Sequence, residues 1–321
     1  DNCPNISNAT IKAIVSSGCP ETLKYLRITG SKKITSFPFQ NKKFEKLISV
    51  DLNECSNIKR LHGLYYGCPE LKELVLDACN MFKEVEFVKV ITKCKKLRAI
   101  SILCCYQLSH SLIEYIACEC SQIEELFVWG NNFAIPKVNR TRICNANCVS
   151  LHHPCPTLFK LEHLVKVRLN MKNWTKKQTM CFIRNLASRG LANEVSLNYA
   201  KYFDNKMLST LVKGCWRTLK NLWIVESSSL TNHIGILGNC CIHLDTLALD
   251  NCLQITPDIA HVILNDFPYL ETFCVDGVNL SENMVEALLR KSKIKLIISG
   301  NNESYLLDRF GTMCKSLSEV F

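Results

Sequence analysis

The stretch Cys68-Pro69-Glu70-Leu71-Lys72-Glu73-Leu74-Val75-Leu76-Asp77-Ala78-Cys79 decides the fold, because it is the clearest copy of a pattern that runs through the chain. Its apolar residues follow the order Leu-x-x-Leu-x-Leu, at Leu71, Leu74 and Leu76. Side chains alternate across a β-strand, so the pattern predicts a short strand whose leucines face inward. The residues between the leucines then face the opposite side.

The third apolar position recurs along the whole chain, at Ile28, Leu52, Leu76, Ile102, Val128, Leu169, Leu197, Ile224, Leu249, Val275 and Ile298. The steps between neighbours are 24, 24, 26, 26, 41, 28, 27, 25, 26 and 23 residues. A period in the twenties is the signature of leucine-rich repeats, which stack to bury their apolar sides. The sequence therefore predicts an α/β leucine-rich repeat solenoid over residues 1–321 as a single domain. We expect a curved horseshoe of about eleven to twelve repeats, with parallel strands on its concave face and helices on its convex face.

Cysteines follow the same period. One set lies three residues after the third apolar position, at Cys55, Cys79, Cys105 and Cys252, and a second lies near the expected helix ends, at Cys19, Cys68, Cys94, Cys120, Cys215 and Cys241. The motif Leu-x-x-Leu-x-Leu-x-x-Cys-x-x-Ile/Leu-Ser/Thr is met almost fully at Leu247–Thr256 and at Ile100–Ser109. Over nearly the whole chain this pattern resembles the cysteine-containing repeats of F-box proteins, the substrate receptors of cullin-RING ubiquitin ligases. The resemblance implies a protein that presents a substrate to a Skp1–cullin complex through an F-box.

Both ends of the chain are expected to interrupt a repeat. The segment Asp1–Ser7 aligns with Asp250–Thr256, which follows an expected strand, and Cys314–Phe321 looks like the opening of a further strand. Terminal repeats normally carry a polar cap. We therefore expect a segment upstream of residue 1, where the F-box that the resemblance implies would lie.

Composition narrows the class of protein. With 47% hydrophobic and 21% charged residues, the chain can bury a large core. The sequence contains no run of 18 or more apolar residues, so we expect no membrane-spanning helix. Most of the 20 cysteines recur at repeat positions, where cysteine acts as a small buried hydrophobe, which favours free thiols and a cytoplasmic or nuclear location. Against that location stand six Asn-x-Ser/Thr sequons, at Asn5, Asn8, Asn139, Asn173, Asn279 and Asn302.

The net charge of +10 is concentrated in one block. Residues 137–220 hold sixteen Lys/Arg against three acids, a net of +13, so the rest of the chain carries a net of −3. A focused positive field favours acidic partners. Four of these cations, Lys176, Lys177, Arg184 and Arg189, are expected on an outer helix, where they can equally form an ordinary solvated face.

Equivalent outward positions in neighbouring repeats define a candidate partner-binding patch, made of Phe127, Trp129, Lys166, Arg168, Ser196, Asn198 and Trp223. Large aromatics and arginine are the residue types that anchor protein interfaces. The alternative is that the tryptophans pack under an inserted loop. Further along, Asp245, Asp250, Glu271 and Asp276 give the expected concave face an acidic end, so a partner that reads both halves would itself be charge-segregated.

The 41-residue step is about 15 residues longer than a 26-residue repeat, which places an inserted loop at about 132–160. This loop contains Cys144, Cys148, His152 and Cys155, a cluster compatible with a structural zinc ion. The alternative is a surface loop without metal, since long loops on a rigid scaffold often carry function.

Catalytic signatures are missing from the sequence. It contains no Gly-rich phosphate loop, no G-x-S-x-G elbow and no H-E-x-x-H helix, and its histidines share no spacing. We therefore expect no catalysis and no cofactor other than the possible zinc. Three functions remain open: an F-box/LRR-type substrate receptor with an acidic protein partner, a structural subunit of a large assembly, and binding of nucleic acid or polyphosphate through residues 137–220.

Overall fold

The computed structural model describes residues 4–17, 21–37, 43–105, 107–108, 111–128, 161–172, 174–290, 294–300, 303–307 and 313–316. The chain divides into two compact units, Asp1–Leu164 and Val165–Phe321. The inserted loop predicted at about 132–160 lies outside the described residues, as does Trp129.

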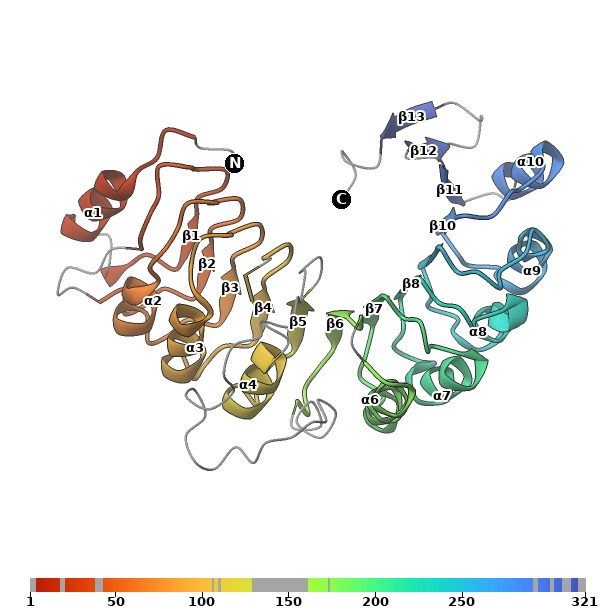
Figure 1. The fold of residues 1–321 in the computed structure, drawn as a ribbon, viewed down its shortest axis with the longest axis horizontal. Coiled ribbons are helices and arrows are strands. Elements are labelled where there is room, and N and C mark those ends of the chain that lie inside the picture. Colours follow the sequence, from red (N-terminus) through yellow and green to blue (C-terminus); the bar gives the residue numbers. More distant parts are fainter. Residues whose placement is uncertain are drawn as a thin grey trace. The chain divides into compact units, whose positions relative to one another are not determined.

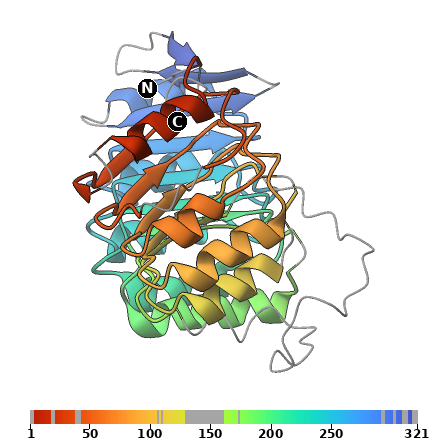
Figure 2. The same ribbon diagram turned by 90° about the vertical axis from the view of Figure 1, so that its left-hand side faces the viewer.

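The first unit is a parallel sheet covered by helices on one side (Figure 1). Its strands are β1 (Tyr25–Arg27), β2 (Ser49–Asp51), β3 (Glu73–Val75), β4 (Ala99–Ser101) and β5 (Glu125–Val128), each paired in parallel with the next. Its helices are α1 (Asn8–Ser16), α2 (His62–Gly67), α3 (Glu84–Lys93) and α4 (Ser111–Glu119). Figure 2 shows α2, α3 and α4 stacked in chain order.

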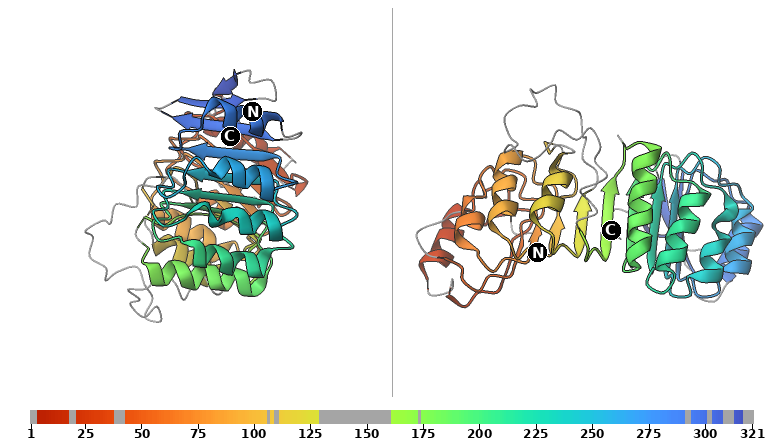
Figure 3. Two further views of the ribbon diagram at one scale, coloured as in Figure 1. Left: turned by 90° about the vertical axis from the view of Figure 1, so that its right-hand side faces the viewer. Right: turned by 90° about the horizontal axis from the view of Figure 1, so that it is seen from below.

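The second unit repeats this arrangement with longer strands (Figure 3). Its parallel strands are β6 (Lys166–Asn170), β7 (Glu194–Asn198), β8 (Asn221–Val225), β9 (Thr246–Asp250), β10 (Thr272–Asp276) and β11 (Lys295–Gly300). Its helices are α6 (Lys176–Arg189), α7 (Asn205–Cys215), η2 (Asn232–Ile234), α8 (Gly235–Cys240), α9 (Ile259–Asp266) and α10 (Glu282–Arg290). The predicted strand-first repeats are thus confirmed in both units.

The carboxyl-terminal residues differ from the prediction. Strand β12 (Glu303–Leu307) pairs antiparallel with β11, and β13 (Met313–Ser316) pairs antiparallel with β12. The prediction that Cys314–Phe321 opens a further strand stays a prediction, because the residues after Ser316 lie outside the described ones. Antiparallel pairing needs only a short turn, whereas a parallel strand needs a crossover of a dozen or more residues, and the interval from β12 to β13 is too short for one.

The leucine pattern forms these elements for the expected reason. Leu71, Leu74 and Leu76 are fully buried, whereas Glu73 between them is exposed. The following helix α3 turns Phe87, Val90 and Ile91 into the core at helical spacing. Burial of each such side chain contributes about 1.5–3 kcal/mol, so a repeat is stable only against its neighbours.

The periodic cysteines link successive repeats. The Sγ atoms of Cys55, Cys79, Cys105 and Cys252 donate to the carbonyl oxygens of Ile28, Leu52, Leu76 and Ile224 at 3.3, 3.1, 3.1 and 3.4 Å. Each acceptor is the third apolar residue of the preceding repeat. Burial raises the pKa of these thiols, to about 12 for Cys105 and about 11 for Cys252. All four of these cysteines carry a free, buried thiol.

In eight repeats the residue two positions after the third apolar residue adopts a left-handed backbone. This position holds Gly30, Glu54, Ala78, Cys104, Tyr199, Glu226, Asn251 and Gly277, with φ between 49° and 74°. Only glycine adopts this conformation without strain, so the non-glycine residues oppose folding by about 1–2 kcal/mol each. The chain turns away from the strand here, and the register of the repeats imposes the conformation.

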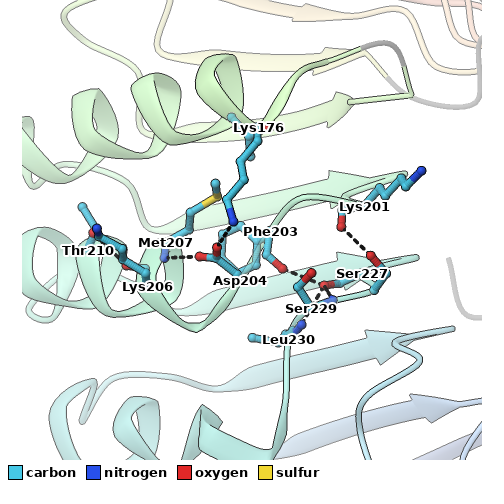
Figure 4. A network of polar contacts seen from close by, with 12 residues as sticks. Lys176, Lys201, Phe203, Asp204, Lys206, Met207, Thr210, Ser227, Ser229 and Leu230 are labelled. Carbon is cyan, nitrogen blue, oxygen red and sulfur yellow. Dashed lines mark hydrogen bonds and ion pairs between the residues drawn. The ribbon is translucent and has the colours of Figure 1, made fainter.

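Side chains cap the helices and bridge neighbouring repeats, as at the start of α7 (Figure 4). The Asp204 carboxylate accepts from the Met207 amide at 3.0 Å and pairs with Lys176 Nζ at 3.0 Å. Burial alone would raise the pKa of Asp204, but the hydrogen bonds from Lys176 and Met207 hold it below its ordinary value. Because Lys176 begins α6, this pair fixes the starts of two adjacent helices.

Close packing of α6 on α7 requires glycine at one position. A Cβ atom on Gly214 would collide with the Ala187 carbonyl oxygen of α6. The lone hydrogen of glycine therefore allows the two helices to approach closely. Within the described residues, no helix combines the length and apolarity that a membrane crossing demands.

Candidate partner-binding surface

The solvent-facing side chains of β6, β7 and β8 form rows across the second unit. Parallel register places Arg168 opposite Ser196, and Ser196 opposite Trp223. The row before it places Lys166 opposite Glu194. The predicted alternation therefore brings five of these side chains onto one strand face.

Arg168 is the centre of this surface. Its Nε donates to Glu194 Oε1 at 2.7 Å, and its guanidinium carbon lies 5.1 Å from the centroid of the Trp223 ring. Trp223 is two strands away from Arg168, so the side chain reaches across β7 to touch it. An arginine stacked on an indole and held by a carboxylate is fixed in position before any partner arrives. We call Arg168, Glu194 and Trp223 the arginine–tryptophan stack.

The positions predicted at Ser196 and Asn198 need correction. Ser196 is fully buried and Asn198 is buried as well, so neither presents surface to a partner. Ser196 lies between Arg168 and Trp223, and the stack excludes solvent from it. Its Oγ has no hydrogen-bond partner among the described residues. The Asn198 amide oxygen instead accepts from the Tyr199 amide at 2.9 Å, at the left-handed turn.

The other predicted patch residues have mixed positions. Lys166, Arg168 and Trp223 are half-buried on the strand face of the second unit. Phe127 is half-buried on β5 in the first unit, and Trp129 lies outside the described residues. The partner contacts of these residues stay a prediction.

Two lysine–tyrosine pairs at the carboxyl ends of β6 and β7 were missed from the sequence. Lys172 Nζ lies 5.4 Å from the centroid of the Tyr199 ring, and Lys201 Nζ lies 5.7 Å from that of Tyr202. Tyr202 is partly exposed. The pairs form between residues 27 apart and between direct neighbours, so only knowledge of the repeat register would have revealed the first one.

The predicted acidic end contains two carboxyl groups that share one hydrogen-bond donor. Asp250 and Asp276 follow each other at the carboxyl ends of β9 and β10, and Asn251 Nδ2 donates to both, at 2.9 and 3.1 Å. Burial, followed by the neighbouring carboxylates of Asp276 and Glu226, raises the pKa of Asp250 to about 7. Asp250 therefore retains its proton at mildly acidic pH. The negative charge of this end is smaller than the count of acids suggests.

The predicted zinc ligands Cys144, Cys148, His152 and Cys155 lie outside the described residues, so the zinc site stays a prediction. Elsewhere, in the parts of the chain that the structure describes, no cluster of three His, Cys, Asp or Glu side chains suits a metal ion. The outer-helix cations Lys176, Lys177 and Arg184 are exposed on α6, as expected for a solvated helix face.

Comparison with known proteins places the fold. No protein-family model matches the sequence. A chain in the crystal structure of the Rad7 and Elc1 complex in yeast matches with a TM-score of 0.51 and 14% identity, over 90% of this chain and 75% of that one. An internalin (InlF) from Listeria monocytogenes gives 0.47 and 14%, over 91% and 94%. The leucine-rich repeat protein LegL7 from Legionella pneumophila gives 0.41 and 13%, over 84% and 86%.

The match with a TM-score of 0.51 shows the fold alone, because an identity of 14% does not establish a shared activity. The strand–helix repeats, their parallel register and the periodic cysteine ladder agree with that likeness. The chain therefore has the α/β solenoid fold of leucine-rich repeat proteins.

Proposed function

We propose that this chain is a non-catalytic recognition scaffold, the substrate-binding part of an F-box/LRR-type ubiquitin ligase receptor that acts in the cytoplasm or nucleus. The observation that carries the proposal is the arginine–tryptophan stack on the strand face of the second unit. Repeat scaffolds bind partners across such strand faces, and buried arginine and tryptophan anchors dominate interface energies.

The chemistry of the stack favours an acidic partner segment. The Arg168 side chain is 31% exposed, and Lys166 lies next to it on the same strand. Glu194 holds Arg168 in place, so little side-chain entropy is lost when a partner carboxylate approaches. The half-exposed Trp223 ring offers apolar area beside that charge. A peptide that places a carboxylate next to an apolar side chain fits both.

The ligase part of the proposal rests on the repeat pattern. Cys105 and Cys252 lie in the two stretches that meet the F-box/LRR motif almost fully, and the thiol of each donates to a carbonyl of the preceding repeat. The solved chain with a TM-score of 0.51 comes from a two-protein complex of Rad7 with Elc1. Both observations are consistent with a receptor subunit that joins a Skp1–cullin complex through another part of the polypeptide.

The test uses the full natural polypeptide in cells that lack it, with ubiquitin-remnant peptides quantified by mass spectrometry and Skp1 measured in the purified complex. Arg168→Glu should abolish the ubiquitination of specific proteins and leave Skp1 association unchanged. Arg27→Glu is the matched control, because Arg27 occupies the same repeat position on β1 and pairs with Asp51 at 3.0 Å. Binding of a protein through Arg168 without any Skp1 association would rule out the ligase role and leave a structural subunit.

A second candidate function rests on the two lysine–tyrosine pairs. Cationic side chains beside aromatic rings suit the phosphates and bases of single-stranded nucleic acid, and both pairs lie within the basic block 137–220. Affinity for a single-stranded oligonucleotide should then fall steeply with salt. Lys201→Glu should weaken it, whereas Lys59→Glu, an exposed control in the first unit, should not. An equal loss with both variants would remove this candidate.

A further inference from the structure

A row of exposed apolar side chains lies along one edge of the second unit. Four successive connections from a helix to the next strand each expose one large apolar residue, and these are Leu191, Trp216, Ile242 and Tyr269, with 40–65% of each exposed. We call these four residues the apolar edge. Single exposed apolar residues are ordinary, but a row in consecutive repeats is not.

Backbone hydrogen bonds place the four connections side by side in order. The Lys220 amide donates to the Asn193 carbonyl at 2.8 Å, the Asp245 amide to Lys220 at 2.8 Å, and the Glu271 amide to Asp245 at 2.9 Å. Each apolar residue precedes one of these positions by two to four residues. The four residues therefore follow one another in repeat order along this edge.

The first unit shows that the repeat itself does not require this row. The same connections there expose charged residues, and Lys96 Nζ pairs with Glu70 at 2.6 Å while Lys95 Nζ pairs with Glu119 at 2.6 Å. Gln122 occupies the next connection and is exposed. The edge of the first unit is thus polar and well solvated, whereas the apolar edge of the second unit favours burial against a binding partner.

Charge changes along the apolar edge. Beside Leu191 and Trp216 lie four basic residues, Arg189, Lys213, Arg217 and Lys220, and the Arg217 guanidinium lies 4.5 Å from the centroid of the Trp216 ring. Beside Ile242 and Tyr269 lie Asp245, Asp266 and Glu271. A binding partner that matches these charges must be acidic next to Leu191 and Trp216 and basic, or neutral, next to Ile242 and Tyr269.

We propose that the apolar edge is a second docking surface, which binds an amphipathic helix of another protein with its acidic end against Leu191 and Trp216. An α-helix that carries one apolar residue per turn presents them about 5.4 Å apart, close to the general spacing of about 4.8 Å between neighbouring strands. An extended strand presents same-side residues about 6.7 Å apart, which is longer than the spacing between neighbouring strands, so its side chains would not match successive repeats. The acidic end of the edge disfavours an anionic lipid surface.

The probe is a synthetic helical peptide of about 14 residues with one leucine per turn, glutamates in its first half and lysines in its second. A second peptide keeps the leucines and exchanges the two charged halves. Binding of each labelled peptide to the whole chain is measured by fluorescence anisotropy. The first peptide should bind at least about tenfold more tightly than the second. Equal affinities would overturn the proposal.

Variants locate the binding. Trp216→Ser combined with Ile242→Ser should weaken the first peptide at least about tenfold, because both residues are predicted to anchor it. Lys95→Ser combined with Lys96→Ser, on the matching edge of the first unit, should leave it unchanged. If the double edge variant loses its native circular dichroism spectrum, Leu191→Lys at the exposed end of the row gives the same test. Binding that survives each folded edge variant would overturn the proposal.

Other occupants are distinguished by two further measurements. Sedimentation that shows self-association of the chain, abolished by the edge variant, would replace the helix with a second copy. Binding to vesicles that contain phosphatidylserine, abolished by the same variant, would replace it with a membrane. Arg168→Glu should leave peptide binding to the apolar edge unchanged, so failure here is separate from failure of the strand-face proposal.

Discussion

Removal of the Arg168 guanidinium tests how much the arginine–tryptophan stack contributes to the free energy of unfolding. Arg168→Met keeps much of the apolar stem but deletes the 2.7 Å hydrogen bond to Glu194 and the contact with Trp223. The Glu194 side chain is only 11% exposed, so its carboxylate is left poorly solvated and without this partner. A hydrogen bond to a charged group is worth about 1.5–3 kcal/mol, and a partly exposed cation–π contact about 0.5–1 kcal/mol.

Because Arg168 is 31% exposed, solvent screening reduces these figures, and we expect a loss of about 2 kcal/mol in the free energy of unfolding. The assay is urea denaturation of the chain followed by far-UV circular dichroism, with transitions of the two units fitted separately. Glu194→Gln in the Arg168→Met background should restore about 1 kcal/mol, since it removes the unpaired charge.

Arg27→Met provides the matched control for this experiment. Arg27 has the same repeat position and an ion pair of 3.0 Å, but its side chain is 64% exposed. Surface pairs of this kind contribute about 0–1 kcal/mol. If Arg168→Met destabilises the chain no more than Arg27→Met does, the reasoning about the stack is refuted.

Three further predictions follow from the repeat geometry and the titrating groups. At the left-handed position, Gly277→Ala should destabilise the second unit by about 1 kcal/mol, and Glu54→Gly should stabilise the first unit by about 0.5 kcal/mol. Urea denaturation measures both changes, and two changes of the same sign would contradict the strain argument. Because the pKa of Asp250 is raised to about 7, its contribution to stability is fully present below the unfolded pKa near 4 and is lost as pH rises to about 7. After a discount for solvent screening, the stability of the wild type relative to Asp250→Asn should fall by about 1–2 kcal/mol between pH 4 and pH 8. A stability difference that does not change with pH would show that the pKa of Asp250 is not raised. Burial raises the pKa of Cys94 to about 12, so a disulfide reagent should label the exposed Cys104 well before Cys94 in the native state. Peptide mapping after timed labelling measures both rates, and equal rates would show that Cys94 is not buried.

The sequence predicted the elements whose period is local. A leucine at every second or third position fixes the inward side of each strand, so β3 and α3 follow from residues near Leu71 and Phe87 alone. The cysteine ladder was placed correctly for the same reason, because each thiol keeps a constant distance from the leucines. The carboxyl-terminal strands β12 and β13 break the period, and their antiparallel pairing has no counterpart among the described strands before them.

The candidate surface was harder to predict, because it depends on contacts between repeats. Ser196 has the right alternation for an exposed residue, yet Arg168, 28 residues earlier, reaches over it to Trp223. The length of a neighbouring side chain decides this burial, and periodicity does not contain that information. The apolar edge was missed for a similar reason: Leu191 and Tyr269 look unrelated until the backbone ladder aligns them.

The central claim is that a protein partner binds the strand face of the second unit at the arginine–tryptophan stack. Photo-crosslinking in cells tests it most directly, with a benzophenone amino acid placed at Trp223 or, as a control, at the exposed Arg184 on α6. The account predicts one dominant crosslinked protein from position 223, absent from position 184 and lost when Arg168→Glu is added. The same crosslinked proteins from both positions, or a crosslink at 223 that persists with Arg168→Glu, would contradict it.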